Sequence, residues 1–440
     1  MFSTLRDMHE KHKRLVLLGL IALSLAPLPL IVVHHEDPTA TQAALWLSAV
    51  TGYFGLILML WEYILGVKSV FGLWFQDLAP VLQIHKWLGK YGTLLIFLHP
   101  ILITYAYGES LLYSVLPHVS TQFERHVTLG RIALLILVVV WFTSAIVREK
   151  IKFRPWKYIH YLIYVALPFG FLHVPNVGSQ YMSQRAVQAY FYTLLVGFTL
   201  FTMLRVRSFF NIDRSAYMVT KQQQIADDVH MVMLIPAAHR MTPQRGQYVY
   251  LKMGFISEDH PFSVTQYDPE TGAITLAYRT YGAYTLDMAA RLQVGGQVYL
   301  SGPHGAFMTE VAASQKPRVY IGGGIGVTPF IDDVLRPRDD TEQWLFYANR
   351  SRLSAPFTQQ LRDKLGSRLV QVYSRDQNAK LTPGLEVGRL RREIFSKYLS
   401  NPAQYEYYLC GTEAMLDTVS QELLAIGVAP SDIHQEAFSW

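Results

Sequence analysis

Six long apolar segments in the first half of the chain constrain its fold more than any other feature. A helix needs about 20 mostly apolar residues to cross the hydrocarbon of a bilayer. Six segments approach or exceed that length, and they are, approximately, residues 15–33, 43–65, 83–107, 128–147, 157–174 and 187–205. The sequence therefore predicts a six-helix transmembrane bundle, with membrane lipid as its surroundings.

The second half of the chain has the pattern of a water-soluble α/β protein. Residues 217–310 alternate short strands with Gly and Pro turns, which is typical of a small antiparallel barrel. A strand, a glycine loop and a helix follow, as in Rossmann-like domains. We predict a multidomain membrane protein with boundaries at 1–210 for the bundle, 211–312 for the β-barrel and 313–440 for the α/β domain.

The positive charges predict the orientation of the spans. The net charge is +6, and its excess lies beside the apolar segments, so the composition does not call for nucleic acid as a partner. By the positive-inside rule, both termini and the soluble half should be cytoplasmic, with the bundle in the plasma membrane. The first apolar segment is too long for a cleavable signal, so we expect it to remain. The cationic flanks are 6–14, 68, 148–157 and 205–214.

Four histidines lie inside two of the predicted spans. The third and fifth spans should run parallel, with His85 and His160 near the inner end and His99 and His173 one helix length further on. Fourteen residues rise about 21 Å along a helix, which is most of the hydrocarbon thickness. Neutral imidazole is a good axial iron ligand, and two imidazoles per iron make an electron-transfer site. We therefore predict two stacked b-type haems, an inner one at His85/His160 and an outer one at His99/His173.

Alternatives to this haem prediction remain open. Each histidine alone is equally well explained as an isolated polar residue in a helix bundle, but four of them at two levels favour function. On an ideal helix, thirteen residues rotate His173 about 140° away from His160, and a kink at Pro168 is one way to correct this phase. Gly89 and Gly92 either leave room for a flat macrocycle or serve helix packing.

The barrel region carries motifs that suit a flavin dinucleotide. A pyrophosphate needs a fixed cation and backbone N–H groups, which an arginine beside a glycine- and hydroxyl-rich turn supplies. Turn chemistry alone explains each motif separately, but not their ordered series. The predicted FAD-binding residues are His260, Pro261, Phe262, Ser263, Thr265, Arg279, Gly282, Thr285, Gly302 and Gly305.

The α/β region carries a glycine loop between a strand and a helix. Such a loop lets backbone approach a dinucleotide pyrophosphate at the helix N-terminus. After the next strand, Arg350 and Ser351 favour a 2′-phosphate, hence NADPH over NADH, unless they are solvated loop residues. The predicted loop residues are Gly322, Gly323, Gly324, Gly326, Thr328 and Pro329.

Residues near the end of the chain complete the predicted reaction site. Cys410 and Gly411 follow a late strand and either face the nicotinamide or, for the thiol, fill the core. Phe438 and Trp440 are aromatic residues that either stack on the flavin ring or are simply tucked in. Cys410 is the only cysteine, so disulfide frameworks and cysteine-ligated clusters are excluded.

Taken together, these motifs resemble those of the ferric reductase and NADPH oxidase superfamily over nearly the full length of the chain, in its bacterial type. The histidines, 14 residues apart on the third span and 13 on the fifth, are similar to its haem scaffold. Four segments of the soluble half are similar to its flavin, GPxG, NADPH and C-terminal motifs, namely His260–Thr265, Gly302–Gly305, Gly322–Pro329, and Cys410-Gly411 with Glu436–Phe438.

The resemblance implies electron flow from cytoplasmic NADPH through FAD and two haems to a small-molecule acceptor outside. We predict oxygen as this acceptor, with a ferric chelate as the alternative. The uncharged stretch Ala43–Tyr53 lacks the arginine that some superoxide-forming members of the superfamily carry there. A haem membrane subunit that delivers electrons to a partner protein or quinone is the alternative of another class. A proton-relay transporter would leave the nucleotide motifs unexplained.

Overall fold

The computed structural model describes residues 2–32, 39–75, 78–254, 257–308, 315–376 and 383–437. The chain divides into two compact units, each of which is considered by itself below. One unit, Leu5–Val206, is helical, and the other contains Arg207–Trp440 and both predicted sheets.

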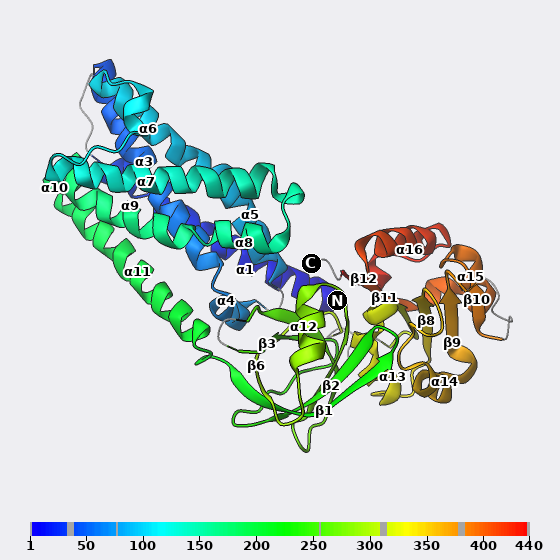
Figure 1. Ribbon diagram of the computed structural model, residues 1–440. Coiled ribbons are helices and arrows are strands. Elements are labelled where there is room, and N and C mark those ends of the chain that lie inside the picture. Colours follow the sequence, from blue (N-terminus) through cyan, green and yellow to red (C-terminus); the bar gives the residue numbers. More distant parts are fainter. Residues whose placement is uncertain are drawn as a thin grey trace. The chain divides into compact units, whose positions relative to one another are not determined.

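The helical unit contains six helical stretches that are long and apolar enough to cross a membrane. They are Lys11–Leu30, Ala40–Leu65, Pro80–Tyr107, Gln122–Ile146, Phe153–Val177 and Arg185–Phe209, close to the six predicted spans. In Figure 1 these helices run side by side within the unit. The individual helices are α1 (Phe2–Leu25), α2 (Leu28–Ile31), α3 (Ala40–Leu65), α4 (Lys68–Trp74), α5 (Ala79–Trp87), α6 (Thr93–Tyr107), α7 (Gln122–Trp141), α8 (Phe153–His160), α9 (Ile163–Val177), α10 (Ser179–Ser183) and α11 (Arg185–Phe209).

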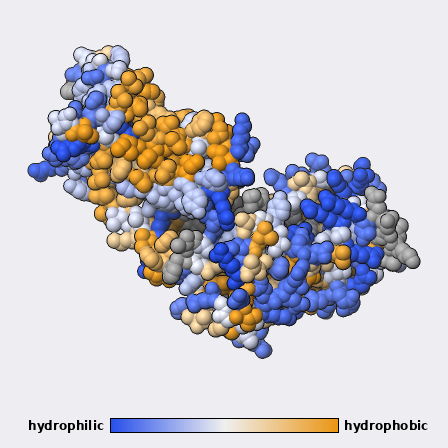
Figure 2. Space-filling view, viewed as in Figure 1, coloured by the Kyte–Doolittle hydropathy of each residue, from blue (hydrophilic) through white to orange (hydrophobic). Residues whose placement is uncertain are grey.

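Local sequence explains where the spans begin and which way they face. Thr39 and Thr121 form capping boxes with Gln42 and Glu124, so that α3 and α7 start with satisfied N–H groups. Large apolar side chains remain exposed along the outside of the bundle, and Figure 2 shows hydrophobic residues covering much of its surface. In water such an apolar surface would favour aggregation, whereas in lipid it is the favourable one.

Two of the spans are interrupted next to the histidines. A π-turn at Leu88–Gly92 separates α5 from α6, and the helix breaks at residues 161–162, between α8 and α9. Pro168 lies inside α9, and a further interruption directly follows His160 at residues 161–162. The span therefore has a second place, besides Pro168, at which the helical phase between His160 and His173 can change.

The predicted antiparallel β-barrel is confirmed, and the structure shows that it is closed and has six strands. Its strand order is β1-β2-β5-β4-β3-β6, and helix α12 (Ala283–Arg291) follows β5. Alternate residues such as Tyr217, Val249 and Leu276 fill the interior. The strands are β1 (Ser215–Ala226), β2 (Val229–Pro236), β3 (Tyr248–Lys252), β4 (His260–Tyr267), β5 (Ile274–Arg279) and β6 (Gln297–His304).

The last part of the chain folds into a parallel six-stranded sheet with the order β10-β9-β8-β7-β11-β12. Its central strands are buried on both faces, which explains their continuous apolar runs. The strands are β7 (Arg318–Gly323), β8 (Gln343–Asn349), β9 (Leu369–Tyr373), β10 (Leu385–Val387), β11 (Glu406–Gly411) and β12 (Ile433–Ala437). The helices are α13 (Thr328–Leu335), α14 (Thr358–Leu365), α15 (Arg392–Tyr398) and α16 (Glu413–Ala425).

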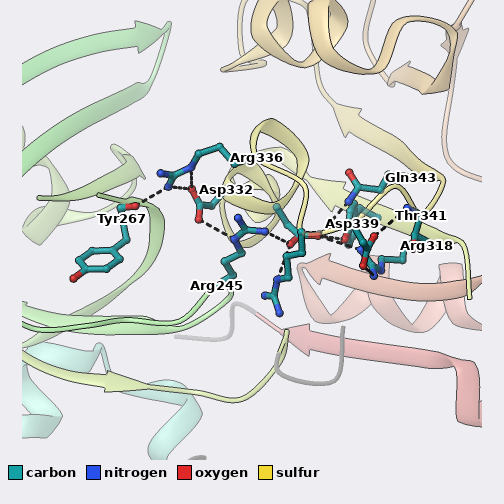
Figure 3. A network of polar contacts seen from close by, with 11 residues as sticks. Arg245, Tyr267, Arg318, Asp332, Arg336, Asp339, Thr341 and Gln343 are labelled. Atoms are coloured by element: carbon teal, nitrogen blue, oxygen red, sulfur yellow. Dashed lines mark hydrogen bonds and ion pairs between the residues drawn. The ribbon is translucent and has the colours of Figure 1, made fainter. Parts of the chain in front are cut away.

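A polar network joins the barrel to helix α13 (Figure 3). Arg245 donates to Asp333 at 2.7 Å and to Asp332 at 3.2 Å, and Asp333 is fully buried. Arg318 donates to Asp339 at 2.6 Å, and this hydrogen bond lowers the pKa of Asp339 to about 2. Charged pairs with several hydrogen bonds have a preferred geometry. The network therefore sets how the barrel and the sheet meet.

Candidate functional site

The structure brings the four span histidines together as two facing pairs. The ring centres of His85 and His160 lie 6.1 Å apart with planes at 76°, and those of His99 and His173 lie 6.5 Å apart at 82°. An iron held between two imidazole nitrogens at roughly 2 Å each needs ring centres roughly 6 Å apart. Both pairs therefore fit a bis-histidine haem. Among the described residues, no group of three or more His, Cys, Asp or Glu could hold a bare metal ion.

The His99/His173 pair is anchored by backbone carbonyls. Nδ1 of His99 lies 2.8 Å from the carbonyl oxygen of Ser48, and Nδ1 of His173 lies 2.9 Å from that of His126. A carbonyl accepts only, so each Nδ1 must carry the proton and each Nε2 keeps its lone pair. This is the tautomer that a metal-ligating histidine needs.

The His85/His160 pair is anchored by side chains. Nδ1 of His85 lies 2.9 Å from Oε2 of Glu62, and Nδ1 of His160 lies 3.2 Å from Oγ of Ser144. Trp156 stacks on the His160 ring at 5.0 Å and donates to the same serine at 3.1 Å. The two pairs thus share a geometry but differ in charge, because a carboxylate faces only His85.

Small residues allow the anchoring helices to approach the histidines closely. A Cβ at Gly52 would lie 2.8 Å from Nδ1 of His99, and one at Gly130 would lie 2.6 Å from Nδ1 of His173. Gly89 and Gly92 instead face Glu62 and Leu58 on α3. The helix-packing interpretation of these last two glycines therefore accounts for their position.

The predicted flavin residues gather on one part of the barrel. His260 stacks on Tyr284 with ring centres 3.8 Å apart, and Phe262 lies nearly parallel to Tyr284 at 6.4 Å. Thr265 is fully buried and its hydroxyl accepts from the N–H of Ala277 at 3.1 Å. Pro261 and Ser263 lie beside these residues in β4, opposite β3.

Several turns beside them have backbone conformations that favour glycine. Gly282 has φ 94° where α12 begins, and Gly302 and Gly305 have φ 126° and 92°. The hydroxyl of Thr285 accepts from the N–H of Tyr281 at 2.8 Å, which holds this turn. The N-terminus of α12 therefore offers the free N–H groups that a pyrophosphate binds.

The glycine loop closes tightly on the neighbouring strand. Gly322 and Gly323 end β7, a turn spans Gly324–Val327, and α13 begins at Thr328 with Pro329 as its second residue. A Cβ at Gly326 would collide with the carbonyl of Cys410. Thr328 donates to the carbonyl of Ile325 at 3.0 Å. These contacts explain why the segment is rich in glycine.

Arg279 extends from the barrel toward that loop. Its guanidinium donates to the carbonyl of Ser354 at 2.9 Å and lies 3.2 Å from Asp228. A Cβ at Gly324 would lie 3.1 Å from it. Arg279, which was predicted from the sequence to bind the FAD pyrophosphate, thus lies where the barrel meets the glycine loop.

A basic cavity lies at the carboxyl ends of strands β8, β9 and β10. It measures about 510 Å³, and it is lined by Arg350, Ser374, Arg375, Gly388, Arg389 and Arg391. Of the residues that line the cavity, only Arg350 was predicted from the sequence as a 2′-phosphate ligand. Ser351, the other predicted ligand, does not line the cavity and instead hydrogen-bonds to Ser354 in the adjacent turn. The Ser-Arg pair directly after β9 is a signal that could have identified the cavity, because parallel strands end at one edge.

The remaining predicted residues are placed less favourably for chemistry. Cys410 is completely buried in the core between β7 and β12, and burial raises the pKa of its thiol. The core-filling alternative describes this position, and a role beside the nicotinamide stays a prediction. Gly411 ends β11 next to Gly323. Phe438 and Trp440 lie outside the described residues.

Comparison with known proteins matches one segment in each half of the chain to a described family. Residues 51–171 match the family described as ferric reductase like transmembrane component, and residues 320–421 match the oxidoreductase NAD-binding domain. The flavohemoprotein of Candida norvegensis is 26% identical over 235 residues, 50% of this chain and 57% of that protein. The electron transfer subunit of dihydroorotate dehydrogenase B (NAD(+)) from Shouchella clausii is 34% identical over 116 residues, 25% of this chain and 44% of that protein.

The matches span about half the length of the curated relatives. The FAD/NAD-binding domain of a nitric oxide dioxygenase from Vibrio cholerae superposes with a TM-score of 0.46 at 20% identity, over 51% of this chain and 98% of that chain. One chain therefore carries a ferric-reductase-like transmembrane component followed by an oxidoreductase NAD-binding domain, and this order matches the fused architecture of the ferric reductase and NADPH oxidase superfamily.

Proposed function

We propose that this protein is a transmembrane oxidoreductase that carries electrons from cytoplasmic NADPH to molecular oxygen on the other side of a bacterial inner membrane. When bound, FAD would accept a hydride and pass single electrons to two b-type haems held by His85/His160 and His99/His173. The observation that carries the proposal is that the same two spans hold two pairs of facing imidazole rings, whose ring centres lie 6.1 and 6.5 Å apart.

The chain's own residues would hold and orient these groups. The Nδ1 partners are Ser48, His126, Ser144 and Glu62, and they would hold each ring in one orientation with its Nε2 left free to bind iron. In the soluble unit, the β4 motif would hold the flavin, and the glycine loop would bind the pyrophosphate of the nicotinamide nucleotide.

The basic cavity supports NADPH as the donor. Arg350, Arg375, Arg389 and Arg391 line it, and none of the four has an ion pair with a carboxylate within the part of the chain that the structure describes. A dianionic 2′-phosphate is the ligand that such a set of guanidinium groups binds best. A ribose hydroxyl would instead call for a carboxylate.

The connection that precedes α7 supports oxygen over a bulky chelate as the acceptor. His118 is stacked on Tyr113 at 5.2 Å, and its backbone exchanges hydrogen bonds with Thr128 at 2.6 and 3.1 Å. His126 is bonded through Nδ1 to the carbonyl of Gln122 at 2.8 Å. These histidines are engaged in local structure, whereas oxygen needs no ligands from the loop. Reduction of a ferric chelate is the second candidate.

The test combines a spectrum with an acceptor assay on the purified full-length protein. We expect a reduced-minus-oxidised spectrum of bis-histidine b-type haem at two haems per FAD. NADPH consumption should require oxygen, and superoxide dismutase should block the reduction of added cytochrome c. Dismutase-insensitive reduction with retained ferric-chelate activity would assign the second candidate, and a protein without haem absorbance would refute the proposal.

A further inference from the structure

Arg131 is a buried cation to which the described residues offer no hydrogen-bond acceptor. It lies in the first half of α7 and is only 4% exposed. Its Nε, Nη1 and Nη2 atoms have no acceptor among the described residues. The guanidinium lies over the ring of Tyr113, with Cζ 4.4 Å from the ring centroid. A ring face attracts a cation, but it leaves the five N–H donors of arginine without acceptors.

An unpartnered guanidinium in a membrane-spanning helix calls for an anion. Arginine stays protonated in proteins, so it cannot escape the cost of burial by losing its proton. Charges inside spans are normally paired, and they mark functional positions. No described carboxylate forms an ion pair with Arg131, and an anion bound beside it would supply the missing acceptor.

The surroundings of Arg131 place this anion beside the His99/His173 pair. The preceding residue, Gly130, packs directly on the His173 ring, since a Cβ there would lie 2.6 Å from Nδ1. Arg131 is also close enough to His173 to interact with it electrostatically. On its other side, Tyr113 is stacked on His118 at 5.2 Å. Arg131 therefore lies between one ligand of the pair and the aromatic residues of the preceding connection.

We propose that Arg131 binds a carboxylate, and specifically a propionate of the haem held by His99 and His173. A planar guanidinium binds a carboxylate through two parallel N–H···O bonds. A carboxylate would therefore both neutralise the buried charge of Arg131 and accept hydrogen bonds from its unused N–H donors. The carboxylate of a ferric chelate has the same chemistry, but the stacked Tyr113 and His118 cover the site and favour a resident group. This inference rests on the proposed haem sites.

The test is a cycle of one substitution and one modified cofactor, carried out on the full-length protein. The chain is produced without haem and reconstituted with haem or with haem dimethyl ester, and loss to a haem-scavenging protein is timed. We expect Arg131→Gln to speed the loss of one of the two haems about tenfold or more, as for a charge-assisted hydrogen bond. The ester should do the same in the wild type and have no further effect in Arg131→Gln. Arg131→Lys should lie in between.

The control is Arg125→Gln, the same substitution at an exposed arginine of the same helix. It should leave both haems as firmly held as in the wild type. If Arg131→Gln and the ester each speed haem loss and their effects multiply when combined, the two act independently, and the inference is overturned. Unchanged haem retention with a raised KM for ferric citrate would also overturn it, and would assign the carboxylate to the acceptor. A wild type that takes up no haem would instead refute the proposed function, and the inference with it.

Discussion

At the scale of single residues, the two histidine pairs differ in what stands behind them. Glu62 places a carboxylate 2.9 Å from Nδ1 of His85, whereas His99 has the neutral carbonyl of Ser48 at 2.8 Å. A carboxylate behind a ligating histidine raises the basicity of the ligand and stabilises the more positive state of the metal. The pair that contains His85 should therefore hold its haem at the lower potential, which favours electron transfer toward the other pair.

Replacing Glu62 by Gln should raise the potential of one haem. The substitution removes a negative charge but keeps a hydrogen-bond acceptor, so the oxidised state loses stabilisation. We expect a tenfold or larger shift toward the reduced form, which is about 59 mV for one electron. A redox titration followed by visible spectroscopy measures it. Glu149→Gln, at an exposed glutamate of the same unit, is the control. Superimposable titrations of Glu62→Gln and wild type would contradict the role assigned to Glu62.

At the scale of elements, the close packing of α3 on α6 decides the environment of His99. Gly52 of α3 lies against the His99 ring, and Gly55, one turn further, lies against Ile96. The absence of side chains at both positions lets Ser48 reach the histidine. The packing of α3 on α6 thus determines the position of the His99 ring, because any side chain at Gly52 would push that ring away from the carbonyl of Ser48.

Gly52→Ala should cost the protein one of its two haems. The new Cβ would lie 2.8 Å from Nδ1 of His99, so the ring must move and the facing geometry is lost. Haem per protein, measured by the pyridine haemochrome spectrum, should fall from two toward one. Gly197→Ala is the matched control, because a Cβ there would meet nothing within 4 Å. Equal haem content in the two variants would show that the ring position does not depend on this packing.

The ends of strands β8, β9 and β10 form the second site at this scale. Arg375 follows β9 and lines the basic cavity together with Arg389. Arg375→Gln should raise the KM for NADPH about 10- to 100-fold, the cost of one charge-assisted contact, and leave the KM for NADH unchanged. Steady-state kinetics with both nucleotides checks this. Arg392→Gln serves as the control, since Arg392 faces Glu422 instead. A parallel rise for NADH would point to a general loss of structure.

At the scale of the whole molecule, the flanking charges predict an orientation. By the positive-inside rule all cationic flanks are predicted to lie on one side of the membrane, and the C-terminal unit is predicted to be cytoplasmic. A fluorescent protein fused to the C-terminus should therefore be bright, and alkaline phosphatase fused there should be inactive. Fusions to the segment between α6 and α7 should give the reverse result. Active phosphatase at the C-terminus would overturn the orientation and, with it, access of cytoplasmic NADPH.

Much of the architecture could be predicted because its signals are local. Span length, the period of the barrel strands and the glycine loop each depend on residues that are near one another in the sequence. The pairing of His85 with His160 and of His99 with His173 also followed from spacing. The helix break at residues 161–162 did not, because neither Tyr161 nor Leu162 is a residue that marks a break in the sequence.

The sequence by itself determined the fold class, the six spans and which histidines could meet. These features follow from hydrophobic length and periodicity, which act along the chain. Only the tertiary structure decided that Glu62 stands behind His85 and that Arg375 and Arg389 share a cavity with Arg350. It also decided that Arg131 is buried beside His173 with no acceptor among the described residues. Contacts of this kind join residues far apart in the chain, and their energy depends on burial and distance, which appear only when the elements pack.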